Sequence, residues 1–238
     1  MLKQSSRLTL AVALVAATTL IAGGVAIASN TGFKINKPLT VAGAGQIGNN
    51  WLSIPYFSPY TNGAELCAQL DFSIGAVKAS LLKINAVNGA ASTASCGTPA
   101  AGAFTWNPGD GIRVRNAGDG GDPAPTSAII VGSHNPSTSL SIPDAGGGNI
   151  GNFWFAVPYH TTAVTAQDLC NSVGMTSVPI PPPGSGSRGQ VGRLNSVSGA
   201  FTTVSCGTDA ALALTLVLGE AVRLREPEGP ISFVPAHF

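Results

Sequence analysis

The sequence has few charged residues, since Asp, Glu, Lys and Arg make up only 10% of it, against about a quarter in an ordinary globular protein. The 12 basic and 11 acidic side chains nearly cancel. This balance excludes the basic surface that binds DNA or RNA and the polybasic cluster that binds anionic lipid. Intrinsic disorder is excluded as well, because hydrophobic residues make up 44% of the chain and its net charge is low.

Motifs of catalysis and metal binding are also missing. The four cysteines form no C-x-x-C pair, and the sequence contains neither H-E-x-x-H nor G-x-S-x-G. A G-x-G-x-x-G match at Gly184–Gly189 follows three prolines instead of a strand, so it predicts no dinucleotide site. We therefore expect a protein that is not an enzyme and that has no metal and no cofactor. For the alternative, a secreted hydrolase, His134 and His237 are the residues to test.

Residues 1–28 have the layout of a secretory signal peptide. Lys3 and Arg7 precede an apolar run from Leu8 to Ala22, and Ala26-Ile27-Ala28 matches the small-residue cleavage pattern. Cleavage after Ala28 would leave 12 − 2 = 10 basic and 11 acidic residues, a net charge of −1. We expect an exported protein of the extracellular space, cell surface or periplasm, with no membrane contact after cleavage. The alternative is a retained anchor, because Leu8 to Ala28 could nearly span a bilayer.

The chain contains the same pattern twice. G-N-N-W-L-S-I-P-Y begins at Gly48, and G-N-F-W-F-A-V-P-Y begins at Gly151, 103 residues later. N-A-V-N-G-A followed by S-C-G-T, from Asn85 onward, is matched by N-S-V-S-G-A and S-C-G-T from Asn195 onward. Such internal similarity marks tandem structural units. We predict two homologous repeats, residues 33–135 and 136–238, each long enough to bury a core of its own.

Each repeat carries two cysteines at equivalent places. Export would put them where disulfide bonds persist. We predict one disulfide bond per repeat, Cys67 with Cys96 and Cys170 with Cys206, because each repeat must be able to form its own bond. The chain-entropy estimate for such a bridge is about 3–4 kcal/mol.

Short segments of alternating apolar and polar residues predict a mainly β fold of two tandem β-rich repeats. Asn88-Gly89 and Ser198-Gly199 separate apolar segments in the manner of hairpin turns. Each repeat also has one short predicted helix that carries its first cysteine, and Thr165 with Asp168 resembles a capping box. The predicted strands include, in the two repeats, Trp51–Pro55, Ile112–Arg115, Ile129–Val131, Val222–Arg225 and Phe233–Val234.

Taken together, N-W-L-S-I-P-Y, L-C, S-C-G and P-G-D-G resemble a module of uncharacterised secreted bacterial proteins with the pattern N-W-x-S-L-P-Y, L-C, S-C-G and P-G-E-G. The similarity covers both repeats. It implies a surface or extracellular protein, and it implies no reaction, since none is established for the module. The chain departs from the pattern at Ile112 and Val222, where the module commonly has an aromatic residue.

An aromatic segment follows the first Trp motif, and it supplies the candidate ligand-binding residues. These are Tyr56, Phe57 and Tyr60 in the first repeat and Tyr159 and His160 in the second. Exposed aromatic loops stack on sugars or anchor a protein partner. The alternative, which we favour, is that these rings cover the repeat's own core. Trp51 and Trp154 are predicted to be core residues, because Trp is highly buried on average.

Two functions from different classes follow. The first is a binding or adhesion module whose ligand is a glycan, a cell-wall polymer or a protein. The second is a structural subunit that self-associates, with the polar stretch Ser29–Pro38 extending as a strand to a neighbouring chain.

Overall fold

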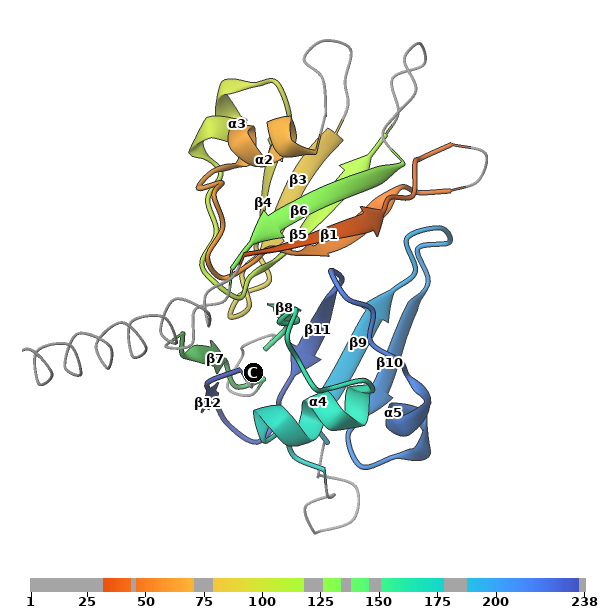
Figure 1. Ribbon diagram of the computed structural model, residues 1–238. Coiled ribbons are helices and arrows are strands. Elements are labelled where there is room, and N and C mark those ends of the chain that lie inside the picture. Colours follow the sequence, from red (N-terminus) through yellow and green to blue (C-terminus); the bar gives the residue numbers. More distant parts are fainter. Residues whose placement is uncertain are drawn as a thin grey trace, which may run out of the picture. The chain divides into compact units, whose positions relative to one another are not determined.

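The two halves of the chain contain the same elements in the same order (Figure 1). The computed structural model describes residues 32–43, 46–70, 79–117, 126–133, 138–145, 151–177 and 188–235. The predicted signal peptide and the histidines His134 and His237 lie outside these residues.

The first half is built on a four-stranded antiparallel sheet with the order β2-β5-β3-β4. Ile112 and Val114 point to the buried face of β5, and Arg113 and Arg115 alternate with them on the other face. The predicted turn at Asn88-Gly89 joins β3 to β4. Gly89 has a φ of 72°, a backbone conformation that glycine adopts more readily than other residues. The strands are β2 (Asn49–Ser53), β3 (Ala79–Ile84), β4 (Ala91–Ser95) and β5 (Gly111–Asn116).

Two short helices, α2 (Gly63–Gln69) and α3 (Pro99–Ala103), lie side by side in this half (Figure 1). The side chain of Asn62 caps α2 by accepting a hydrogen bond from the backbone amide of Glu65. Helix α2 carries Cys67, and the disulfide bond to Cys96 ties it to the end of β4. The sequence predicted one helix per repeat, and α3 is an additional one. Its five residues are too few to show a helical period.

The second half repeats this arrangement, with the sheet order β10-β9-β11-β8. Thr165 and Asp168 form the predicted capping box at the start of α4. The disulfide bond from Cys170 to Cys206 ties α4 to the end of β10. The elements are β8 (Phe153–Ala156), α4 (Ala166–Val173), β9 (Gln190–Leu194), β10 (Phe201–Ser205), α5 (Asp209–Ala213) and β11 (Ala221–Arg225).

Each half also has a two-stranded ribbon. Strand β1 (Phe33–Pro38) pairs with β6 (Ser127–Gly132), and β7 (Leu140–Ile142) pairs with β12 (Ile231–Phe233). The second strand of each ribbon falls where the last strand of the repeat was predicted. Strand β1 is part of the stretch Ser29–Pro38 that was expected to reach a neighbouring chain. It is instead paired within its own chain.

The mainly β fold of two similar repeats, each with a disulfide bond, is confirmed. Residues from Lys34 onward cluster as one compact unit, so the repeats pack against each other. In the part of the chain that the structure describes, every helix is too short or too polar to cross a membrane.

Two tryptophans join the repeats. The rings of Trp51 and Trp154 stack in parallel, with 3.5 Å between their centroids and 1° between their planes. Leu82 and Ala221 complete this apolar cluster. The prediction that both tryptophans are buried is confirmed, but they lie between the two repeats and not inside either of them.

Hydrogen bonds at this junction come in pairs related by the repeat. The backbone amide of Ser53 donates to the carbonyl of Gly219 (3.0 Å), and the equivalent amide of Ala156 donates to the equivalent carbonyl of Gly109 (2.8 Å). The Tyr56 hydroxyl donates to the Ala156 carbonyl (3.0 Å). Its counterpart, the Tyr159 hydroxyl, donates to the Ser53 carbonyl (2.5 Å). These four hydrogen bonds are related by the repeat, as equivalent contacts in a symmetric dimer are related by its axis.

Substitution of Gly111 tests the closeness of this packing. A methyl group on Gly111 would lie 2.5 Å from the Cβ of Ala221 and 3.2 Å from the Trp154 carbonyl oxygen. We expect Gly111→Ala to lower the free energy of unfolding by about 1–3 kcal/mol, measured by urea denaturation without reductant. Gly102→Ala in α3 is the control, because nothing lies within 4 Å of the added methyl group. Equal stability of the two variants would contradict a close-packed junction.

Candidate functional site

The aromatic residues suggested by the sequence are mostly enclosed. Tyr56 and Tyr60 are 8% and 5% exposed, whereas Phe57 is 65% exposed. Tyr159 and His160 are partly exposed. Burial of the tyrosines favours the interpretation that these rings cover the core. Their role in ligand binding stays a prediction, for which Phe57 is the most exposed ring of the five.

The tyrosine hydroxyls have defined partners inside the protein. Tyr56 packs with the core of the second repeat, and Tyr159 packs against the core of the first. Tyr60 stays within its own repeat, where its hydroxyl donates to the carbonyl of Val131 and accepts from the amide of the same residue, both at 2.9 Å. Two of the three rings therefore hold the repeats together.

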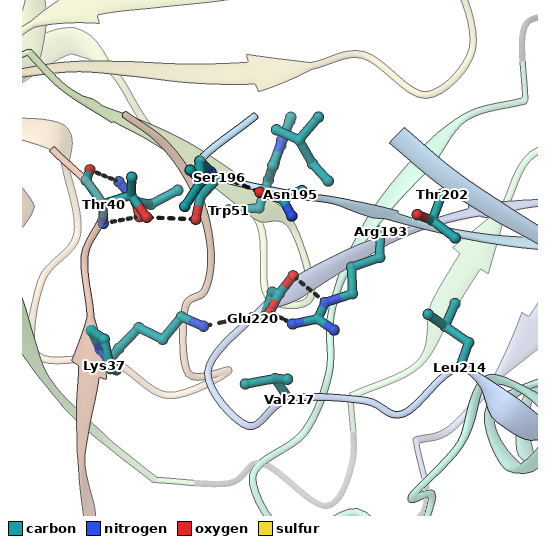
Figure 2. Close-up of a pocket in the computed structure, with 14 residues that line it drawn as sticks. Lys37, Thr40, Trp51, Arg193, Asn195, Ser196, Thr202, Leu214, Val217 and Glu220 are labelled. Carbon is teal, nitrogen blue, oxygen red and sulfur yellow. Dashed lines mark hydrogen bonds and ion pairs between the residues drawn. The ribbon is translucent and has the colours of Figure 1, made fainter. Parts of the chain in front are cut away.

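The structure points to a different site, a pocket between the repeats with a volume of about 420 Å³. We call it the Glu220 pocket. Lys37 in β1 and Trp51 in β2 line it from the first repeat, and Arg193 at the end of β9 lines it from the second (Figure 2). The other lining residues are Pro38, Thr40, Asn50, Leu194, Asn195, Ser196, Val197, Thr202, Leu214 and Val217.

Two cations converge on one carboxylate in this pocket. Figure 2 shows Lys37 and Arg193 reaching Glu220 from opposite sides. The guanidinium of Arg193 donates from Nε and from its second terminal nitrogen to the two carboxylate oxygens, at 2.8 and 3.0 Å. Such a paired contact is the strong form of this interaction. The Lys37 Nζ lies 3.5 Å from Oε2 of Glu220.

Burial affects the two cations differently. Desolvation lowers the pKa of Lys37, more than the attraction of Glu220 raises it, and Arg193 lowers it further. For Arg193 the hydrogen bonds to Glu220 dominate and raise its pKa. Lys37 is therefore the less well compensated of the two charges.

Hydroxyl groups surround this charged cluster. The Thr40 and Ser196 hydroxyl oxygens lie 2.7 Å apart and join the two repeats. Asn50 is buried, and its side chain is used within the fold by the backbone of Thr40 and Gly48. Thr202 lies on the edge strand β10 and is exposed. The pocket thus presents charged and polar groups next to the exposed apolar side chain of Val217, which suits a polar ligand.

An equivalent pocket of about 340 Å³ lies on the other side of the junction. We call it the Asp110 pocket. Lys83 and Asp110 take the places of Arg193 and Glu220, with 3.8 Å between the charged atoms. Burial raises the pKa of Asp110, although an amide hydrogen bond from Asn107 and the charge of Lys83 lower it. Trp154 lines this pocket as Trp51 lines the first one.

The Glu220 carboxylate is held in place by its cationic neighbour. Both of its oxygens accept hydrogen bonds from Arg193, which fixes the position of the charge. Among the described residues, no group of three or more His, Cys, Asp or Glu side chains is placed to hold a metal ion.

Sequence reasoning did not find Lys37, Arg193 or Glu220. The internal repeat contained a signal for two of them, because an acid follows the turn glycine in both copies, at Asp110 and at Glu220. A cation stands at the equivalent positions Lys83 and Arg193. Lys37 gave no such signal, since the equivalent residue in the second copy is Leu140.

The enclosed tyrosines predict an unusual alkaline titration. Burial raises the pKa of all three tyrosines above the ordinary value of about 10. Because the pKa is raised in the folded state, their stabilising contribution is complete below the unfolded value and is lost as the pH rises through the folded one. We expect phenolate absorbance of the native protein to appear only together with unfolding. Absorbance that titrates near pH 10 (roughly) in the folded protein would mean that a ring is exposed.

Comparison of the chain with protein-family models, with curated proteins and with solved structures found no match.

Proposed function

We propose that the protein is an exported, non-enzymatic binding module that holds a polar ligand, a glycan, in the Glu220 pocket. The observation that carries the proposal is the pocket itself. It is a cavity of about 420 Å³, a size typical of small-molecule sites, with a charged cluster at its centre. The site is made by both repeats, so their packing positions it.

The lining has the composition of a sugar site. Val217, which is 37% exposed, offers apolar surface to the C–H face of a sugar ring, and Thr202 offers a hydroxyl to the ring substituents. The fork between Arg193 and Glu220 holds donors and an acceptor in fixed places. Pre-positioned polar groups lower the entropy that is lost when a ligand binds.

Export is supported by two independent features. Residues 1–28 have the layout of a signal peptide. The disulfide bonds Cys67–Cys96 and Cys170–Cys206 are compatible with an oxidising compartment. We place the module outside the cytoplasm on these grounds, at the cell surface, in the extracellular space or in the periplasm.

Removal of one hydroxyl tests the site. Thr202→Ala deletes a side chain that lines the Glu220 pocket from an exposed strand, so folding is expected to be intact. We expect about a 5- to 10-fold loss of affinity for the tightest oligosaccharide of a panel of neutral and acidic trimers, measured by isothermal titration calorimetry.

Ser92→Ala is the matched control for this substitution. Ser92 stands at the equivalent place on β4 and lines the Asp110 pocket. We expect the Ser92→Ala variant to bind the same oligosaccharide with the affinity of the wild type. An equal loss in both variants, or no binding of any trimer to the wild type, would contradict a glycan site in the Glu220 pocket.

A second function, self-assembly of a structural subunit, is favoured by one surface. Phe57 and Ser133 exchange backbone hydrogen bonds, so Phe57 lies beside the exposed face of β6. Ile129 and Val131 on that face are 39% and 36% exposed. The second repeat has His160 and Ser232 in place of Phe57 and Ile129, so the patch belongs to the first repeat. Exposed apolar patches are typical of interaction surfaces.

Light scattering of the non-reduced protein distinguishes the two functions. If this patch drives assembly, Phe57→Ser is expected to lower the average mass toward that of a monomer. Val164→Ser, which removes a side chain that is 63% exposed outside the patch, is expected to leave the mass unchanged. A wild-type protein that is monomeric at every concentration would rule out self-assembly and leave the binding module.

A further inference from the structure

The two equivalent pockets differ in charge. Lys37, Arg193 and Glu220 give the Glu220 pocket a net charge of 2 − 1 = +1. Lys83 and Asp110 give the Asp110 pocket a net charge of 1 − 1 = 0. The difference comes from one position, because Lys37 corresponds to Leu140 in the second repeat. Leu140 packs into the core of the second repeat, whereas Lys37 lines a cavity.

Lys37 has unused hydrogen-bonding capacity. An ammonium group has three donors. In the described part of the chain the one partner of Lys37 is Glu220, at 3.5 Å, and both oxygens of Glu220 already accept shorter hydrogen bonds from Arg193. The side chain of Lys37 is only 13% exposed, so solvent compensates its charge poorly. An oxygen of a bound ligand can accept the remaining hydrogen bonds of this ammonium group.

The position of the ammonium is fixed by the fold. Strand β1 is paired with β6, and the aliphatic part of Lys37 lies close to Gly219 in the turn before Glu220, as does Ile35. The turn depends on Gly219, whose φ is 78°. Lys37 therefore reaches the pocket from a strand and against a fixed turn, which gives its Nζ a defined place.

We propose that the ligand of the Glu220 pocket is an acidic sugar whose carboxylate is bound by Lys37. This inference rests on the proposed binding function and names the class of ligand. The carboxylate takes the free donors of the ammonium, and the ring hydroxyls meet Thr202 and Arg193. A bound carboxylate also compensates the buried charge of Lys37, which desolvation now disfavours. The neutral Asp110 pocket has no cation to spare and does not bind the acid.

Calorimetry of the mature chain with intact disulfide bonds tests the inference, with a galacturonic acid trimer and the matching neutral galactose trimer as probes. We expect the acidic trimer to bind at least about tenfold more tightly, as a charge-assisted hydrogen bond predicts. Amide shifts of the ¹⁵N-labelled protein are expected to change at Arg193 and Thr202 and to stay constant at Lys83 and Ser92.

The variants lie on the same strand. Lys37→Met keeps the length of the side chain and removes its charge, and it is expected to abolish the preference for the acidic trimer. Lys34→Met is the matched control, because Lys34 is exposed on β1 and does not line the pocket. We expect Lys34→Met to keep the full preference.

Salt provides a test that does not depend on the folding of a variant. Added sodium chloride is expected to weaken binding of the acidic trimer to the wild type and to leave the neutral trimer unaffected. An equal response of both trimers would overturn the proposal.

These measurements distinguish failure of the acidic-sugar proposal from failure of the glycan-binding function. Equal affinity of the two trimers, with amide shifts in the Glu220 pocket, would overturn the acidic ligand and keep the glycan-binding function. Absence of shifts with either trimer would overturn both. An acidic preference that survives Lys37→Met would overturn the role of Lys37, and tighter binding of the peptide Gly-Asp-Gly than of the acidic trimer would overturn the sugar.

Discussion

The stacked rings of Trp51 and Trp154 are the contact on which the rest of the structure depends. They place the two sheets so that Ser53 and Ala156 each donate a backbone hydrogen bond to the opposite repeat. Both pockets lie beside these rings, and each is closed by strands from both repeats. Loss of the junction would therefore remove both sites even if each repeat kept its own disulfide bond and core.

Repetition and divergence explain how one junction supports two different pockets. The pairs Arg193–Glu220 and Lys83–Asp110 occupy equivalent places, so the internal symmetry preserves a cation and an acid on each side. The geometry of the two ion pairs differs, because arginine donates two hydrogen bonds to a carboxylate whereas lysine presents a point charge. The two repeats thus share one scaffold, while the side chains that line their pockets differ.

Much of the fold could be predicted from the sequence, because its signals are local. Turn glycines, the capping residues of α4 and the spacing of the cysteines depend on neighbouring residues, and the structure confirms them. The junction could not be predicted in this way. Trp51 lies on the face of β2 opposite to Leu52, and both faces of the strand are buried. The sequence pattern of a strand buried on both faces is the same whether its own core or a second repeat covers the tryptophan. Lys37 lacked a counterpart in the second copy.

The Glu220 pocket is completed late in folding, because its lining residues come from distant parts of the chain. Lys37 and Glu220 are 220 − 37 = 183 positions apart, and the residues between them include both disulfide bonds. Contacts of such long sequence separation form late, since a large loop must close first. During synthesis the strand with Lys37 emerges early, and its partner Glu220 follows only after most of both repeats. The complete pocket therefore forms only after both repeats have been synthesised and have folded.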